Sequence, residues 1–423
     1  MKSIPFFLIS ILILFFTYEN FLKPKTEEQI RFEKHQKPYM QEIKFKTKSH
    51  KINYKITEKK LGENLLLKKY TLTNGFYSGI SGKRPGGYID FHQNNTIILS
   101  SRGILGYSKN LENNRGFSQI TNNLNDFLGI KQFYKNAGFS FKDLLIYKDK
   151  IFVSYTEEIK TDCWNTSLLF GEMNYSDIQF RKLFISDQCI HSIDNIDKDF
   201  GLWQSGGRIS IYDNENILLS IGDYGERYLA QDIESINGKI IMLNIENSSY
   251  EIISMGHRNP QGLFFDKDKK LIIETEHGPY GGDEINLIKY NKFKGIPNFG
   301  WPVVSTGEHY CKVRKEKNCD EIYLKYPLHK SHMDYGFNEP LKSFVPSIGI
   351  SQIEKVDQRY VVSSMGSDRL GDKSIYFFHL DDNYKIYNFE QIKIGERIRD
   401  LKIKNGNIYM FFENPPAIGL LKL

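Results

Sequence analysis

The chain contains little cysteine, and it lacks several signatures that would identify a cofactor or a catalytic group at once. Its four cysteines, Cys163, Cys189, Cys311 and Cys319, form no C-x-x-C pair, which argues against a zinc site. No G-x-G-x-x-G stretch lies between a strand and a helix, so a nucleotide cofactor is not expected. No Ser-His-Asp grouping with a suitable turn motif is present, which argues against a hydrolase.

Helical periodicity of useful length is also missing, whereas 26 tyrosines and 30 phenylalanines favour β structure. One unit recurs instead: an apolar pair, a turn rich in Asn, Asp or Lys, and an apolar strand. It occurs at residues 89–100, 144–155, 209–222, 263–275, 353–364 and 401–412. Six such units predict an all-β, six-bladed β-propeller, with a sandwich or barrel array as the alternative because the spacing is irregular.

The N-terminus carries an apolar run, residues 4–18, directly after Lys2. We expect residues 1–22 to be a signal anchor or a signal peptide, and the lack of a small-x-small cleavage site favours an uncleaved anchor. Residues 23–60 are rich in Lys and mixed with Glu, which indicates a solvated linker rather than a nucleic-acid or lipid-binding patch. The propeller is expected over residues 61–423, with an insertion at about 303–340, outside the cytoplasm and attached to the membrane through the N-terminal segment.

An even number of cysteines in an exported chain indicates two disulfides. The simplest pairing is Cys163–Cys189 and Cys311–Cys319, with the second bridge closing the insertion loop. The sequence alone does not fix the pairing, and four reduced, buried cysteines remain the alternative.

The most informative stretch reads GHRNPQGLFFDKDKKLIIETEHGPYGGD, from Gly256 to Asp283. It places two polar turns at the ends of consecutive short strands, and both turns could face one pocket. Arg258 and Asn259 on the first turn offer donors for carbonyl or carboxylate oxygens. Gly278 and Pro279 on the second turn expose backbone carbonyls, which hard cations such as calcium accept as ligands.

Together with the Glu-Ile-Asn at 284–286 and the Asn-Phe-Gly-Trp-Pro at 298–302, this stretch resembles the soluble pyrroloquinoline quinone (PQQ) sugar dehydrogenases, also called glucose/sorbosone dehydrogenases. The resemblance covers roughly residues 65–423 and is dense only over 205–302 and 397–400. It implies a six-bladed propeller that uses PQQ and calcium to oxidise an aldose sugar or a related alcohol. It does not name the sugar, the electron acceptor or the oligomeric state, and no nucleic-acid partner is expected.

The resemblance also assigns roles around the cofactor. The matching residues are Gly278 and Pro279 for calcium, Arg258 and Asn259 for the quinone side, and Arg397 and Arg399 for the cofactor's carboxylates. An arginine at position 258 would also stabilise the negative charge that grows on the quinone oxygen as hydride arrives. Glu284, with the backbone of Phe299, is a candidate for a second, structural calcium.

The sequence departs from the family at the general base. Family members carry a histidine where this chain has Gln204, which cannot take a proton, while the aspartate that orients the histidine is kept as Asp223. His191 or Asp223 is a candidate replacement base. Residues 363–366 also lack the lysine that helps to bind the cofactor.

These departures leave two hypotheses. The favoured one is a quinoprotein dehydrogenase whose sugar oxidation is weak and rises in Gln204→His. The competing one is a non-catalytic propeller that serves as a binding or scaffold module at the cell envelope.

Overall fold

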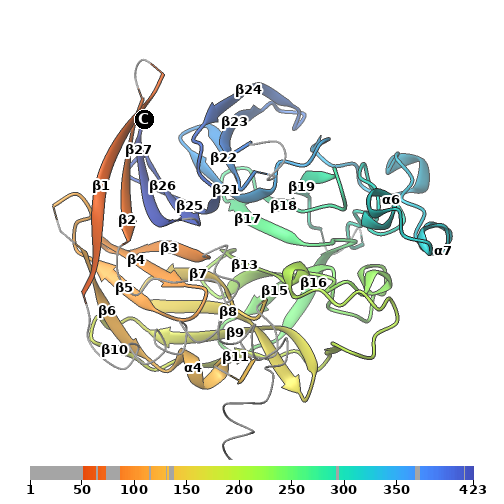
Figure 1. Cartoon of the computed structure of the whole chain (residues 1–423), viewed down its shortest axis with the longest axis horizontal. Helices are drawn as coiled ribbons and strands as arrows, with labels where there is room; N and C mark the ends of the chain where they lie inside the picture. The colour runs from red at the N-terminus through yellow and green to blue at the C-terminus, as the bar shows by residue number, and fades with distance from the viewer. Residues whose placement is uncertain are drawn as a thin grey trace, which may run out of the picture.

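The computed structural model describes residues 51–62, 65–72, 86–113, 116–129, 131–132, 138–291, 295–366, 372–413 and 415–423. These residues form a ring of antiparallel sheets around a central axis (Figure 1). The predicted anchor at residues 1–22, and residues 23–50 of the predicted linker, lie outside the described residues. No helix among the described residues is long and apolar enough to span a membrane.

Six four-stranded blades make up the ring, and five of them follow the chain from the axis to the rim. The first blade consists of β3 (Gly87–His92), β4 (Asn95–Ser100), β5 (Leu105–Ser108) and β6 (Gly116–Asn122), and the second of β7 (Phe141–Tyr147), β8 (Lys150–Lys160), β9 (Cys163–Glu172) and β11 (Arg181–Phe184). The third blade consists of β13 (Gly206–Ile211), β14 (Asn216–Ile221), β15 (Lys239–Asn244) and β16 (Tyr250–Met255), and the fourth of β17 (Pro260–Asp266), β18 (Leu271–Glu276), β19 (Asp283–Ile288) and β20 (Lys342–Phe344). The fifth blade consists of β21 (Ile350–Val356), β22 (Arg359–Ser364), β23 (Ser374–Leu380) and β24 (Ile386–Lys393). Two short strands, β10 (Asp177–Ile178) and β12 (Ile190–His191), pair with β6 and β9.

The sixth blade joins the two ends of the described chain. Strands β25 (Ile398–Lys404), β26 (Asn407–Glu413) and β27 (Pro416–Lys422) are completed by β2 (Leu65–Leu72), which pairs with β27. The innermost strands β3, β7, β13, β17, β21 and β25 each contact the next around a closed ring. The six-bladed propeller is therefore confirmed, and the six units found in the sequence are the two inner strands of the six blades.

The boundary of the propeller differs from the prediction. Strand β1 (Lys51–Leu61) begins within the segment predicted as a linker, and it pairs with β2 along most of its length and with β6 near its start. Most of its side chains are exposed, and only Ile52 and Leu61 are buried. Backbone pairing, rather than burial of side chains, holds this strand in place.

The apolar side chains pack between neighbouring blades. One cluster joins Ile97 and Leu99 of the first blade to Phe141, Val153 and Trp164 of the second, and all five side chains are buried. Polar side chains near the axis add links between inner strands. The Asp143 carboxylate accepts a hydrogen bond from the Ile209 amide at 2.8 Å, and that of Asp400 accepts one from the Ile89 amide at 2.9 Å. These links hold the inner strand ends, which carry the site, in fixed relation.

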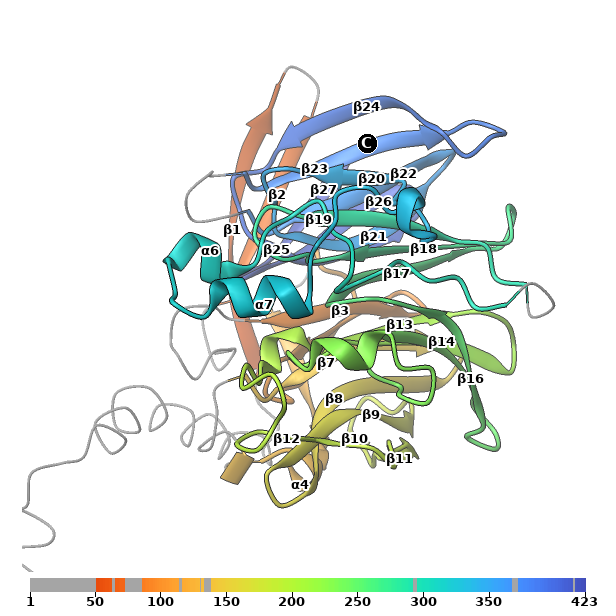
Figure 2. The same ribbon diagram turned by 90° about the vertical axis from the view of Figure 1, so that its right-hand side faces the viewer.

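The segment between β19 and β20 forms the expected insertion. It contains the helices α6 (Tyr310–Arg314) and α7 (Cys319–Lys325) and the 3-10 turn η5 (Met333–Tyr335). Figure 2 shows α6 and α7 together at one end of the propeller. The Cys311–Cys319 bridge joins them, and the Cys163–Cys189 bridge fixes the start of β9, so both predicted disulfides are confirmed. The described residues contain no free cysteine.

Candidate active site

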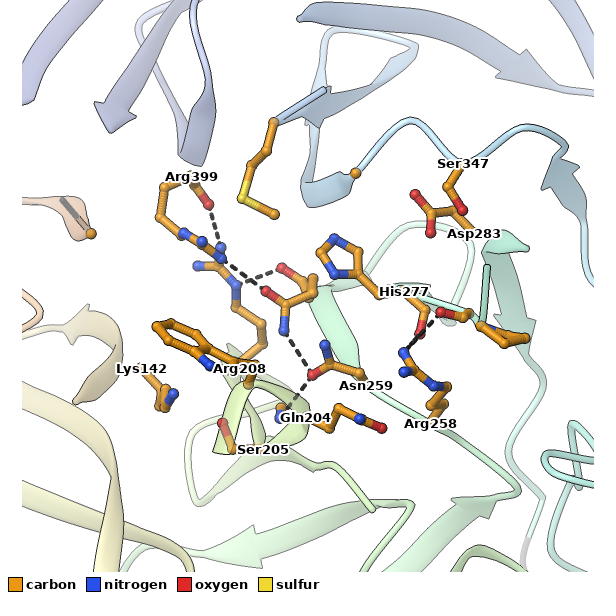
Figure 3. A pocket seen from close by; sticks show the side chains of 18 of the residues that line it. Lys142, Gln204, Ser205, Arg208, Arg258, Asn259, His277, Asp283, Ser347 and Arg399 are labelled. Carbon is orange, nitrogen blue, oxygen red and sulfur yellow. Dashed lines mark hydrogen bonds between the residues drawn. The ribbon is translucent and has the colours of Figure 1, made fainter. Parts of the chain in front are cut away.

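A cavity of about 810 Å³ lies at the end of the central channel where the innermost strands begin. All six blades contribute to its wall, and α6 contributes Tyr310 and Arg314. This volume falls within the range of ligand and cofactor sites. The predicted residues that line it are Gln204, Arg258, Asn259, Gly278, Pro279, Arg397 and Arg399. Residues nearly 200 positions apart thus face one space, as Figure 3 shows for Gln204, Arg258, Asn259 and Arg399.

Arg258 brings a positive charge into this space without a carboxylate partner among the described residues. Its Nη1 donates to the backbone carbonyls of His277 at 3.0 Å and Gly278 at 2.8 Å. The guanidinium carbon lies 5.5 Å from the ring centre of Trp301. The remaining N–H groups of this largely buried side chain are available to an anionic ligand.

Asn259 is oriented by its amide oxygen, which accepts hydrogen bonds from the Gly206 amide at 3.3 Å and from Gln261 Nε2 at 3.0 Å. Its Nδ2 is therefore left to donate to a ligand oxygen. Gln261 in turn accepts from Arg399 Nη1 at 3.0 Å. The resulting chain of hydrogen bonds, visible in Figure 3, connects two predicted cofactor residues through one that sequence reasoning missed.

Arg397 and Arg399 share a single carboxylate, that of Glu413. Arg397 Nε lies 2.8 Å and Arg399 Nε 2.6 Å from its two oxygens. Burial would raise the pKa of Glu413, but the two guanidinium groups outweigh burial and hold that pKa below its ordinary value. Two cations against one anion leave a surplus positive charge at this wall.

Arg208 was also missed by sequence reasoning. It links inner strands of several blades at the centre of the ring. Its buried guanidinium contacts Asp143 at 3.0 Å and Asp400 at 2.9 Å, and donates to the carbonyls of Gln261 and Arg399 at 2.6 Å each. Because its guanidinium bonds two acids and two carbonyls, Arg208 has a structural role beneath the side chains that are predicted to bind the cofactor. The Gly-Gly-Arg at 206–208 was its only signal in the sequence.

The structure separates Asp223 from the cavity. Its carboxylate accepts from Trp301 Nε1 at 2.7 Å and from the Gly225 amide at 2.9 Å, and it does not bond the side chain of Gln204. Burial raises the pKa of Asp223 to about 6. Asp223 is not among the residues that line the cavity, and its assignment as a direct base stays a prediction.

His191, the other candidate for the replacement base, is not among the residues that line the cavity. It is exposed and lines a separate pocket with Cys189 and Asp194. Gln204 does line the active-site cavity, and its side-chain amide makes no hydrogen bond within the part of the chain that the structure describes. Lys142, which was not singled out from the sequence, lies on the same wall (Figure 3).

The carbonyls proposed for calcium remain able to bind a cation. That of Gly278 accepts from Arg258, and that of Pro279 accepts from the Gly282 amide at 3.1 Å. Each carbonyl oxygen has a second lone pair. A cation this close to Arg258 requires a bound anion to balance the two positive charges.

Glu284 and Phe299 lie away from the cavity, beside a buried acidic group. His257, Glu274 and Glu276 place ligand atoms close enough together to hold one metal ion, and the ring of Phe299 stacks on His257 with centres 5.0 Å apart. Burial raises the pKa of Glu274 and of Glu284 well above the ordinary value. Among the described residues, His257 Nδ1 and Glu274 Oε1 are buried without hydrogen-bond partners.

Comparison with known proteins agrees with this geometry. The family described as Glucose / Sorbosone dehydrogenase matches residues 146–421. "Uncharacterized protein slr1608" of Synechocystis sp. is 31% identical over 232 residues, 48% of this chain and 52% of that protein. Quinoprotein glucose dehydrogenase B of Acinetobacter calcoaceticus is 35% identical over 129 residues, 23% of this chain and 26% of that protein.

Among solved structures, the PQQ-bound form of an aldose sugar dehydrogenase from Streptomyces coelicolor superposes with a TM-score of 0.60 at 15% identity, covering 88% of this chain and 99% of that chain. At this identity the match shows the shared fold. The chain spans about half the length of the first curated relative and about a quarter of the quinoprotein. Since the family model covers most of the propeller, the chain belongs to the glucose/sorbosone dehydrogenase family.

Proposed function

We propose that this protein is a PQQ- and calcium-dependent dehydrogenase that oxidises an aldose sugar or a related alcohol in the cavity at the end of the channel. The observation that carries the proposal is the net positive charge of the side chains that line the cavity. Arg258, Arg397 and Arg399 face the cavity, and among the described residues Glu413 is the one carboxylate paired with them. PQQ carries three carboxylates, so its charge suits this surplus of positive charge.

The contacts define what each residue would hold. Arg397 and Arg399 would pair with cofactor carboxylates, because planar guanidinium groups bind them in a fixed geometry. The free Nδ2 of Asn259 and the unbound N–H groups of Arg258 would donate to the quinone oxygens. Gly278 and Pro279 would offer their carbonyls to calcium, with the anionic cofactor balancing the charge of Arg258. When bound, the quinone supplies the hydride acceptor.

The outer part of the cavity suits a sugar. Trp203 is 62% exposed, and it offers a flat face beside Gln204. The free amide of Gln204 can hold a sugar hydroxyl by donating or accepting a hydrogen bond. The relatives that carry activities in their names, a quinoprotein glucose dehydrogenase and a PQQ-bound aldose sugar dehydrogenase, support this substrate class.

The test is titration of the apo protein with PQQ and calcium, followed by absorbance, and then dye-linked oxidation of a panel of aldoses. We expect saturable binding at micromolar PQQ that depends on calcium. Lack of binding would reject the quinoprotein and leave the non-catalytic propeller as the surviving hypothesis.

Arg399→Gln removes one charge from the proposed carboxylate site. A charge-assisted hydrogen bond contributes ~1.5–3 kcal/mol, so PQQ affinity is expected to fall about 10- to 100-fold. The matched control is Arg181→Gln, since Arg181 is an exposed arginine on the second blade. Equal PQQ affinity in Arg399→Gln and the control would contradict the assignment.

We also propose that the protein works outside the cytoplasm, attached through its N-terminal segment, and passes electrons to a respiratory acceptor. Two disulfides support the location, because such bridges persist in oxidising compartments. The test is fractionation of cells that express the full chain, with thiol labelling before and after reduction. Free thiols at all four cysteines in the cytosolic fraction would reject this location.

A further inference from the structure

Lys142 places an amino group on the cavity wall next to the position where the family carries its catalytic histidine. It lies on β7, and its side chain reaches the turn η3 (Leu202–Gln204) that carries Gln204. Figure 3 shows Lys142 and Ser205 on the side of the cavity away from Arg258, with Gln204 between them and Arg258. Lys142 and Gln204 both line the cavity, so a sugar bound there could contact both side chains.

Two backbone carbonyls hold the amino group. Nζ lies 3.2 Å from the carbonyl oxygen of Gly138 and 3.2 Å from that of Leu202. It also lies 6.0 Å from the ring centre of Trp203. A neutral amine uses its two N–H groups for two such carbonyls and keeps one lone pair, which the cavity leaves open to a substrate proton.

The charges around Lys142 favour this neutral form. Arg399 of β25 and Arg102 after β4 act on it, and no described carboxylate forms an ion pair with it. The acids that line the cavity are already engaged: Asp199 with Arg227, Asp283 with two backbone amides, and Glu413 with Arg397 and Arg399. Burial first, and then the two arginines, lower the pKa of Lys142 to about 7.

We propose that Lys142 is the general base of this enzyme and replaces the histidine that Gln204 has displaced. This inference rests on the proposed function. Lys142 Nζ would take the proton of the anomeric hydroxyl, while a bound quinone would supply the acceptor for the hydrogen that leaves the same carbon as hydride. The sugar thereby loses one proton and one hydride and becomes a lactone, with the C–O single bond converted to a carbonyl.

Lys142→Met keeps the length of the side chain and removes the amine. We expect its kcat to fall about 10²- to 10⁴-fold, as for loss of a general base, while PQQ affinity stays within about threefold. Lys142→Arg should lose as much, because guanidinium does not deprotonate in the working range. The matched control is Lys160→Met, since Lys160 is an exposed lysine at the end of β8 in the same blade.

The pH profile separates a base from a simple cation. The wild-type rate should rise with pH through about 7 as the amine loses its proton, and Lys142→Met should lose this limb. If Lys142 instead bound a cofactor carboxylate, Lys142→Met would weaken PQQ binding, Lys142→Arg would restore activity, and the proposal would be overturned.

A measurement on the apo protein tests the amine without activity. Limited acylation at a series of pH values, read by mass spectrometry with the exposed Lys160 as the internal reference, should give half-maximal reactivity of Lys142 near pH 7. Reactivity of both lysines at the same high pH would overturn the proposal. Lack of PQQ binding in the wild type, by contrast, would reject the proposed function whatever the titration of Lys142.

Discussion

At the residue scale, the site is defined by the polar atoms in the cavity that make no hydrogen bond to other described residues of the protein. The amide oxygen of Asn259 is engaged while its nitrogen is free, and Arg258 uses one of its nitrogens for backbone carbonyls. The Gln204 side-chain amide has no hydrogen-bond partner among the residues that the structure describes. Lys142 bonds two carbonyls, which leaves a third position on its nitrogen. All of these polar groups line the same cavity. The cavity therefore suits an oxygen-rich, anionic ligand.

The first prediction concerns Gln204→His. If Lys142 already serves as the base, a new imidazole adds little to the wild type but partly restores Lys142→Met. We therefore expect dye-linked aldose oxidation to rise at least about tenfold in the double variant over Lys142→Met. A large gain in the wild-type background, with no loss in Lys142→Met, would show instead that the chain lacks a base as it stands.

The second prediction concerns the pH dependence of stability at Asp223. Its pKa is raised to about 6 in the folded state, so between about 4 and 6 the folded chain binds more protons than the unfolded chain. The contribution of Asp223 to stability is therefore full at low pH and is lost as pH rises through about 6. The free energy of unfolding of the wild type, relative to Asp223→Asn, should fall by ~3 kcal/mol over that range.

Denaturant titrations of both proteins at several pH values measure this difference. Ser210→Ala, at a half-buried serine of β13, controls for a change remote from the cavity. A difference between wild type and Asp223→Asn that stays constant from pH 4 to 6.5 would contradict the raised pKa.

At the element scale, β17, β18 and β19 bring buried acids together beneath the second polar turn. Asn286 Nδ2 bonds Glu274 at 3.1 Å and Glu276 at 3.0 Å, and the Arg258 amide bonds Glu276 at 2.7 Å. The pKa of Glu274 and of Glu284 is raised because burial and neighbouring carboxylates oppose ionisation. A bound divalent cation would relieve this repulsion and tie the strand ends to the turn that carries Gly278 and Pro279.

The third prediction follows from this arrangement. Calcium added to apo protein without PQQ should raise Tm, because binding at 100 times Kd stabilises the folded state by ~2.7 kcal/mol. Glu284→Gln should reduce this shift, and Glu246→Gln, at an exposed turn, should keep it. Equal calcium shifts in all three proteins would exclude Glu284 as a ligand.

At the scale of the whole molecule, the ring is held closed by a strand from the N-terminal end. Strand β2 pairs with β27, and β1 extends this pairing toward the first blade. Without β2, the outer face of β27 would be an open edge with unpaired backbone groups. Closure also sets the cavity, because Arg397 and Arg399 reach it from the closing blade.

The fourth prediction tests closure through Leu67, a buried residue that pairs with Leu421. Leu67→Pro removes a backbone donor in the middle of β2 and should lower the free energy of unfolding by ~3 kcal/mol or more. Leu67→Val keeps the strand and should lose much less. If the two variants unfold at the same denaturant concentration, β2 does not hold the ring together.

Much of the fold was predictable because each blade repeats a local pattern. The alternation of apolar residues over two inner strands and an Asn- or Asp-rich turn is a property of neighbouring residues, and it located all six blades. Strand β1 was missed for the opposite reason, since it buries few side chains and depends on pairing with β2.

The sequence by itself predicted the number of blades and located the motifs that carry Arg258, Asn259, Gly278, Pro279 and the 397–399 pair, whereas the structure fixed the disulfide pairs. Each of these predictions depends on residue types at short spacing. Only the tertiary structure showed that the Asp223 carboxylate accepts a hydrogen bond from Trp301, and that Lys142 of the second blade bonds the Leu202 carbonyl in the turn before the third blade. Contacts between blades are set by closure of the ring, which joins residues far apart in the chain, so only the folded molecule could show them.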